Sequence, residues 1–121
     1  MTEVPDWIID KVKQARDLFG VGGPEWSISL KMNDRPGGHE AYGYTVTNPT
    51  YLNATIEFAA DLKDDETGQE AVLHEVLHIA LSEIWHIIVE KDEIDEYTEA
   101  MERFITRVVR SIISQNKEFT P

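Results

Sequence analysis

Two histidines and a glutamate stand within five residues, in the segment His74-Glu75-Val76-Leu77-His78. Side chains four residues apart lie on the same face of a helix, so His74 and His78 can direct ring nitrogens at one ion. Zinc binds imidazole nitrogen at about 2.0–2.1 Å. Glu75 points about 100° away around the helix. From there it can reach a water molecule on the metal, which is where a general base is needed. The spacing therefore predicts a Zn²⁺ site with Glu75 as the base.

The segment around this motif predicts an unusually apolar helix. Thr67 and Glu70 match a capping box at its start, and the apolar pattern continues to about Val89. Burying two imidazoles and a carboxylate in such a helix costs several kcal/mol unless each group finds a partner. A metal ion would supply that partner. Core histidines bonded to backbone carbonyl groups are the alternative.

A catalytic zinc site needs a third protein ligand, and this chain contains no cysteine. His86 follows His78 by eight residues, about 12 Å along a continuous helix, so it is not expected to share the ion. His39, in a Gly-rich turn, is an open alternative. The start of the last expected helix offers three carboxylates: Glu96, Glu99 and Glu102.

The rest of the chain predicts an α+β fold in one domain, residues 1–121. Periodicity of 3.6 predicts an N-terminal amphipathic helix over residues 5–19, which Gly20 ends. Three strand candidates follow, at residues 26–32, 41–47 and 51–59. The last expected helix runs from the mid-90s to about residue 116.

Composition excludes several function classes. The formal net charge of −12 repels phosphates, so we expect no nucleic-acid partner. No run approaches the roughly 18 apolar residues of a membrane span. The acidic N-terminus lacks a signal-peptide pattern, so a cytoplasmic protein is expected. The same charge allows an alternative, an acidic decoy that binds a basic, nucleic-acid-binding protein.

The His74-Glu75-x-x-His78 motif resembles that of the zincins, and specifically the gluzincins, or thermolysin-like metallopeptidases. The order of elements is similar to a minimal zincin, such as small phage-encoded proteins show. The resemblance implies that His74 and His78 bind zinc, that Glu75 polarises the water, and that a downstream glutamate completes the site. Glu99, 21 positions after His78, fits this pattern best. Glu102, nearer the apolar face, is second, and Glu96 is third.

The resemblance further implies an extended peptide paired with an edge strand. Asn53-Ala54 resembles the substrate-binding pair of thermolysin, which makes the strand over residues 51–59 the expected partner. Thermolysin-like enzymes also place Tyr and His side chains on the oxyanion. In this chain the oxyanion donor could be Tyr97, Tyr51, His86 or His39, and the sequence does not select one of them.

The expected function is a zinc metallopeptidase that cleaves a peptide or protein substrate. Two alternatives belong to other classes. The first is a catalytically silent, zinc-stabilised domain that acts through protein contacts, and the second is the acidic decoy.

Overall fold

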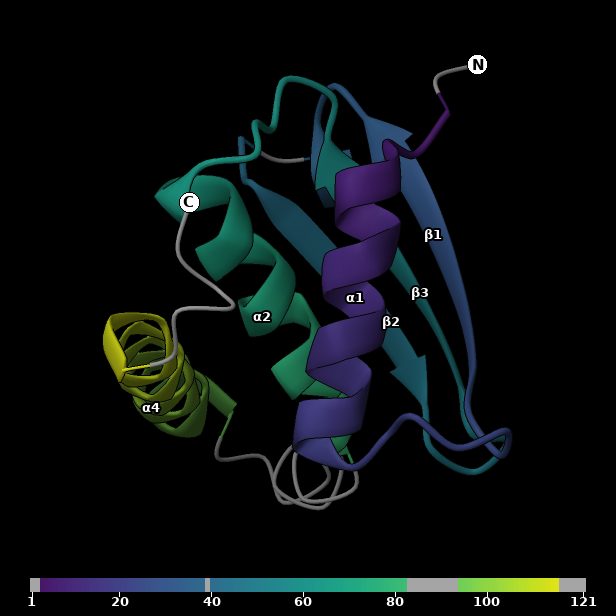
Figure 1. The fold of residues 1–121 in the computed structure, drawn as a ribbon. Helices are drawn as coiled ribbons and strands as arrows, with labels where there is room; N and C mark the ends of the chain where they lie inside the picture. Colours follow the sequence, from purple (N-terminus) through teal and green to yellow (C-terminus); the bar gives the residue numbers. More distant parts are fainter. Residues whose placement is uncertain (1–2, 39, 83–93, 116–121) are drawn as a thin grey trace.

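The computed structural model describes residues 3–38, 40–82 and 94–115, without the side chains of residues 94–98. It confirms an α+β architecture (Figure 1). The elements, in chain order, are α1 (Asp6–Phe19), β1 (Ser27–Asn33), the short 3₁₀ turn η1 (Pro36–Gly38), β2 (Gly43–Asn48), β3 (Asn53–Ala59), α2 (Glu66–Ala80) and α4 (Ile94–Gln115). No helix within these residues is long and apolar enough to cross a bilayer.

The three strands form a mixed sheet in the order β1-β3-β2. The central strand β3 runs parallel to β1 and antiparallel to β2. Asn53 pairs with Ser27 on one side and with Asn48 on the other. The expectation that a peptide pairs at Asn53 and Ala54 is therefore corrected, because both edges of β3 are already filled. In the described part of the sheet, the edge strand antiparallel to its neighbour is β2.

Helices α1 and α2 cover one face of the sheet, and α4 packs beside α2 on the side away from α1 (Figure 1). Alternate residues of β3, including Ile56 and Phe58, are fully buried beneath the helices. On α4, Ile105, Val109 and Ile113 are buried, at intervals of four residues. These intervals put the three side chains on one helical face, which fixes the side that α4 turns toward the core.

Helix α2 begins and ends differently from the sequence-based expectation. Its N-cap is Asp65, whose carboxylate accepts a hydrogen bond from the Gly68 amide at 2.9 Å. Glu70, assigned above to a capping box with Thr67, instead pairs with Arg110 of α4 at 3.0 Å. The helix ends at Ala80 rather than near Val89. Residues 81–89 contain no glycine or proline, so no local signal in the sequence marks this end.

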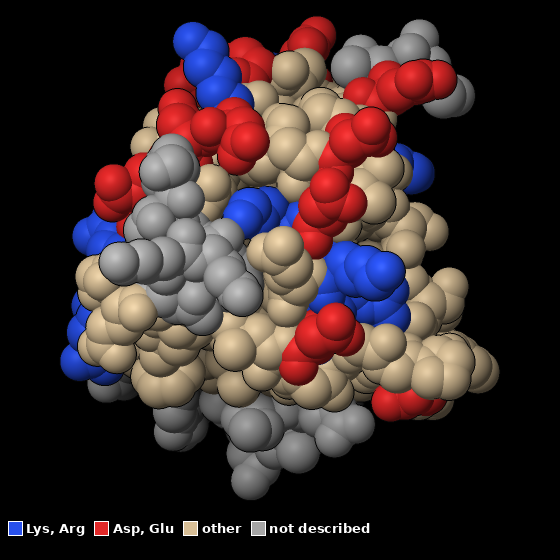
Figure 2. Space-filling model, viewed as in Figure 1, with Lys and Arg blue, Asp and Glu red and all other residues tan. Residues whose placement is uncertain are grey.

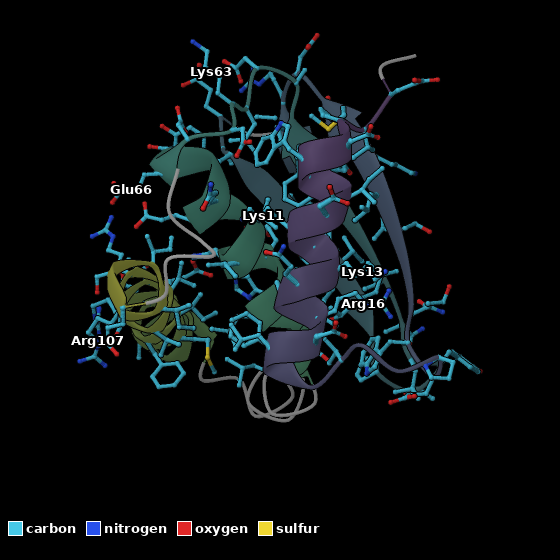
Figure 3. The ribbon with its side chains drawn as sticks, viewed as in Figure 1. Lys11, Lys13, Arg16, Lys63, Glu66 and Arg107 are labelled. Carbon is cyan, nitrogen blue, oxygen red and sulfur yellow. The ribbon has the colours of Figure 1, made fainter. Side chains whose placement is uncertain are left out.

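On the face that α1 occupies, acidic and basic side chains lie next to one another (Figure 2). Lys11, Lys13 and Arg16 project from α1 on this side (Figure 3). The negative charge of the chain is thus not gathered into an unbroken acidic surface on this face. The acidic-decoy alternative stays a prediction.

Candidate metal centre

Two side chains of α2 and one of α4, from a residue more than twenty positions further along the chain, meet between these helices. The ligand atoms of His74, His78 and Glu102 all lie within 4.8 Å of one another. One Glu102 oxygen, Oε2, is 2.9 Å from Nε2 of His74, and the other, Oε1, is 2.9 Å from Nε2 of His78. Both imidazoles therefore present the same ring nitrogen to one carboxylate.

The two histidines reach this point because they are one turn apart on α2. Their ring centroids are 4.9 Å apart, and the rings are inclined at 61°. Both side chains are half-buried, on the side of α2 that faces α4. The expectation that His74 and His78 converge is thus met by the geometry of a single helix.

Glu102, and not Glu99, is the carboxylate at this cluster. The Glu99 side chain is 79% exposed, and its nearest charged partner is Arg103, at 3.9 Å. Glu102 precedes Val109 by seven residues, almost two full turns, so it lies on the face of α4 that packs against α2. Glu99 is rotated away from that face. The structure therefore favours Glu102, the second candidate, as the third ligand.

Other candidates fall where the structure gives no description. His39 and His86 lie outside the described residues, and Glu96 and Tyr97 belong to the part of α4 whose side chains are not described. One continuous helix would have placed His86 too far from His78 to share an ion. Because α2 ends at Ala80, that distance no longer excludes His86 as a ligand.

Without a metal, the cluster is held by hydrogen bonds. Contacts with His74 and His78 keep the pKa of Glu102 far below its usual range, so this group is an ionised carboxylate. An ionised carboxylate only accepts hydrogen bonds, so both Nε2 atoms carry a hydrogen. Burial lowers the pKa of His74, but the hydrogen bond with Glu102 and the charges of Glu75, Glu102 and Glu70 outweigh this and raise it.

The donor set fits a zinc ion. Two imidazole nitrogens and one carboxylate oxygen are the ligands of many catalytic zinc sites, which keep a fourth position for water or substrate. The ligand atoms lie within 4.8 Å of one another, so one ion could contact all three residues. The negative charge of Glu102 would partly neutralise the ion, and each imidazole would offer Nε2 free of hydrogen.

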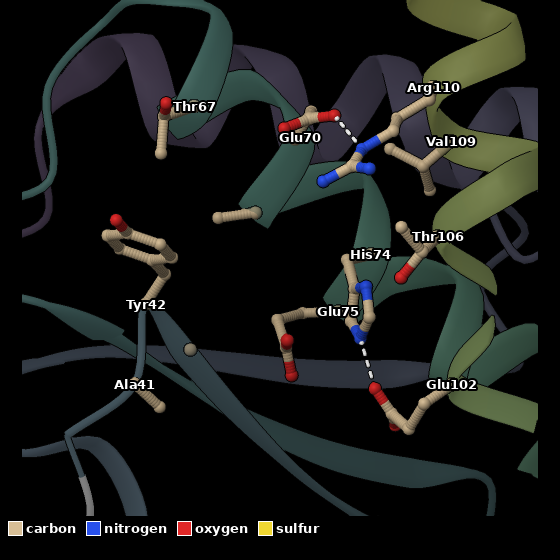
Figure 4. A pocket seen from close by; sticks show the side chains of 12 residues that line it. Ala41, Tyr42, Thr67, Glu70, His74, Glu75, Glu102, Thr106, Val109 and Arg110 are labelled. Atoms are coloured by element: carbon tan, nitrogen blue, oxygen red, sulfur yellow. Dashed lines mark hydrogen bonds and ion pairs between the residues drawn. The ribbon is translucent and has the colours of Figure 1, made fainter. Parts of the chain in front are cut away.

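Glu75 lies beside this cluster and is 7% exposed. Its Oε1 atom accepts a hydrogen bond from the Thr45 hydroxyl of β2 at 2.7 Å. With His74 and Glu102 it lines a cavity of about 390 Å³ between α2, α4 and the start of β2 (Figure 4). The predicted base and two of the three metal-ligand candidates thus border the same space.

Sequence reasoning missed several residues that line this cavity. Tyr42 lies at the β2 side, and Thr106 and Arg110 lie on α4 (Figure 4). Thr106 and Arg110 follow Glu102 at steps of four residues, so a helical projection from Glu102 would have indicated them. No sequence signal indicates Tyr42. Tyr51, an expected oxyanion donor, lies in the turn before β3 and is not among the lining residues.

Comparison with protein-family models, curated proteins and solved structures finds no match for this chain. The resemblance to gluzincins therefore stays a prediction based on the motif and the geometry of its side chains.

Proposed function

We propose that this protein binds one zinc ion through His74, His78 and Glu102 and hydrolyses peptide bonds in a minimal zincin-like arrangement. One observation carries the proposal. The three ligand atoms converge within 4.8 Å, and two of these residues, His74 and Glu102, line a cavity that Glu75 also lines. A purely structural site would have no need of a carboxylate beside its open side.

The choice of zinc follows from the donors and from Glu75. Two histidines and one carboxylate also suit Fe(II), and imidazole sites accept several other divalent metals. A carboxylate placed to receive a proton beside the metal is the requirement of hydrolysis by an activated water. That requirement favours zinc over a redox metal.

Zinc, when bound, supplies polarisation of the scissile carbonyl group and a lowered pKa for an attacking water. Glu75 accepts the proton of that water on its carboxylate and then delivers it to the leaving amine. Its burial beside the cavity keeps the carboxylate at a defined place. His74, His78 and Glu102 hold the ion and take no part in proton transfer.

The substrate class follows from the sheet. Strand β2 is an edge of the described sheet, and it packs against α2, the helix of the motif. An edge strand can pair with an extended peptide through main-chain hydrogen bonds. A peptide added to β2 would run past the cavity at Gly43. This moves the proposed peptide-binding strand from β3 to β2.

Peptide hydrolysis also needs a donor for the developing oxyanion, whose loss typically costs about 10²–10³ in rate. Among the lining residues, Tyr42 carries a phenol and Arg110 a guanidinium group. They replace Tyr51 as candidates.

The test combines metal analysis with turnover. Protein purified without chelator is expected to hold about one zinc per chain, measured by inductively coupled plasma mass spectrometry. Zinc-loaded wild type is expected to cleave members of a quenched fluorescent peptide library, and Glu75→Gln is expected to keep zinc and lose turnover. Zinc without any turnover would leave the silent, zinc-stabilised domain as the better interpretation. Iron in place of zinc would contradict the proposal.

A further inference from the structure

Two residues of strand β2 lie against the Glu75 side chain. The Thr45 hydroxyl lies 2.7 Å from Oε1 of Glu75 and 3.4 Å from its backbone oxygen. A hydroxyl group has one hydrogen to donate, and the shorter contact carries it. Thr45 does not line the cavity, whereas Glu75 does. One carboxylate oxygen is therefore held on the protein side.

Gly43, two residues before Thr45, lies on the same side of β2. A Cβ atom at this position would lie 2.7 Å from Cγ and 3.0 Å from Cδ of Glu75. The backbone of Gly43 does not have a positive φ, so its conformation does not require glycine. Glycine is required at residue 43 because the Glu75 side chain fills the space that a Cβ atom would occupy. Any side chain at residue 43 would therefore displace the Glu75 carboxylate.

We propose that Thr45 and Gly43 are positioning residues for Glu75: Thr45 holds one carboxylate oxygen, and Gly43 leaves room for the side chain. The catalytic consequence rests on the proposed function, but the contact itself does not. A free glutamate samples several rotamers, and a misplacement of about 1 Å can cost about 10²-fold in rate. Holding one oxygen leaves the other for the attacking water.

The proposal gives β2 two roles. The edge that would receive the peptide belongs to the same strand that holds the base. A peptide that pairs with β2 would therefore be placed relative to Glu75 by one rigid element, and not by a loop.

The first experiment needs no substrate. Unfolding of the full chain in urea is measured for Thr45→Val, Glu75→Ala and the double variant, with and without zinc. A hydrogen bond to a charged group is typically worth enough to lower the folding equilibrium constant about tenfold when Thr45 is replaced. In the Glu75→Ala background the same replacement is expected to change it less than about twofold. Equal losses in both backgrounds would overturn the proposal.

The second experiment uses a quenched fluorescent peptide that the wild type cleaves. Thr45→Val is expected to lower kcat about tenfold with KM nearly unchanged, because the Thr45 side chain does not line the cavity and the substitution leaves the backbone of β2 in place. Thr45→Ser, which keeps the hydroxyl, should recover most of the rate. Gly43→Ala should lower kcat by about 10²-fold. Thr55→Val is the matched control, because Thr55 lies on the neighbouring strand β3 and on the opposite face of the sheet from Thr45.

The two experiments separate the possible failures. An unchanged kcat in Thr45→Val would overturn the positioning role. A wild type that binds zinc but cleaves no peptide would overturn the proposed function. The urea measurements would then decide alone whether β2 holds Glu75.

Discussion

Replacing Glu102 by alanine removes one of three protein ligands from the proposed zinc site. Zinc sites with four ligands bind with about 10–16 kcal/mol, or about 2.5–4 kcal/mol for each ligand, which corresponds to about 10²–10³ in Kd. The Glu102 side chain is 44% exposed, so water can enter the vacated position. This places the expected increase in Kd near the lower end, about 10²-fold.

Glu99→Ala is the matched control, since both residues are glutamates on α4, three positions apart. The Glu99 side chain is 79% exposed, and an exposed charge of this kind contributes little to the stability or binding of a site. Its loss is expected to change Kd by less than about twofold. Glu102→Gln serves as a second variant, because it keeps the size of the side chain and removes the charged ligand.

Zinc affinity is measured by competition with a chromophoric chelator, and folding of each variant is checked by circular dichroism. If Glu99→Ala loses zinc while Glu102→Ala retains it, the assignment from the structure is wrong and the original sequence-based choice is right. If neither variant loses zinc, neither residue is the third ligand, and Glu96, His39 and His86 become the next residues to replace.

Metal-free protein should gain stability from the His74–Glu102 pair between about pH 4.5 and pH 6.5, as measured by thermal melting. Because the pKa of Glu102 is lowered by folding, its contribution to stability is lost as the pH falls below 4.5, the ordinary pKa of a glutamate. Because the pKa of His74 is raised by folding, its contribution to stability is lost as the pH rises above 6.5, the ordinary pKa of a histidine. A melting temperature that rises steadily through this window would contradict the pairing. The stabilisation that added zinc provides should grow from about pH 5 to about pH 7.5, because the histidines must lose their protons to bind it; a stabilisation that shrinks with pH would argue against histidine ligands. Asp65→Ala should lower the free energy of unfolding in urea by about 0.5–2 kcal/mol, whereas Thr67→Ala should have little effect, and the reverse order would restore the capping box.

Local patterns predicted the elements of the fold well. Ile28, Leu30 and Met32 alternate with polar residues, and they are the residues of β1 that pack toward the core. Gly20 ends α1 with φ at 79°, a conformation that glycine adopts without strain. These features depend on neighbours in the sequence, which is why the sequence was sufficient to predict them.

Features that depend on distant contacts were not predicted. Chain order does not reveal that β3 is the central strand, so the peptide-binding edge was assigned to Asn53 and Ala54. Choosing between Glu99 and Glu102 requires the angle at which α4 packs against α2. The apolar face of α4 indicated Glu102, but the spacing after the motif favoured Glu99. In the structure Glu102 reaches the two histidines because it lies on the same face of α4 as the buried side chains.

The position of His78 at the end of α2 has a consequence for the stability of that helix. His78 lies in its last turn, two residues before Ala80. Unpaired carbonyl groups give the end of a helix a partial negative charge, which favours a cation there by about 0.3–1 kcal/mol. An ion joined to His74 and His78 would also link the last two turns of α2, where the backbone frays most easily. Bound zinc would thus stabilise the C-terminal end of α2, and its release would increase fraying of the last turn of this helix.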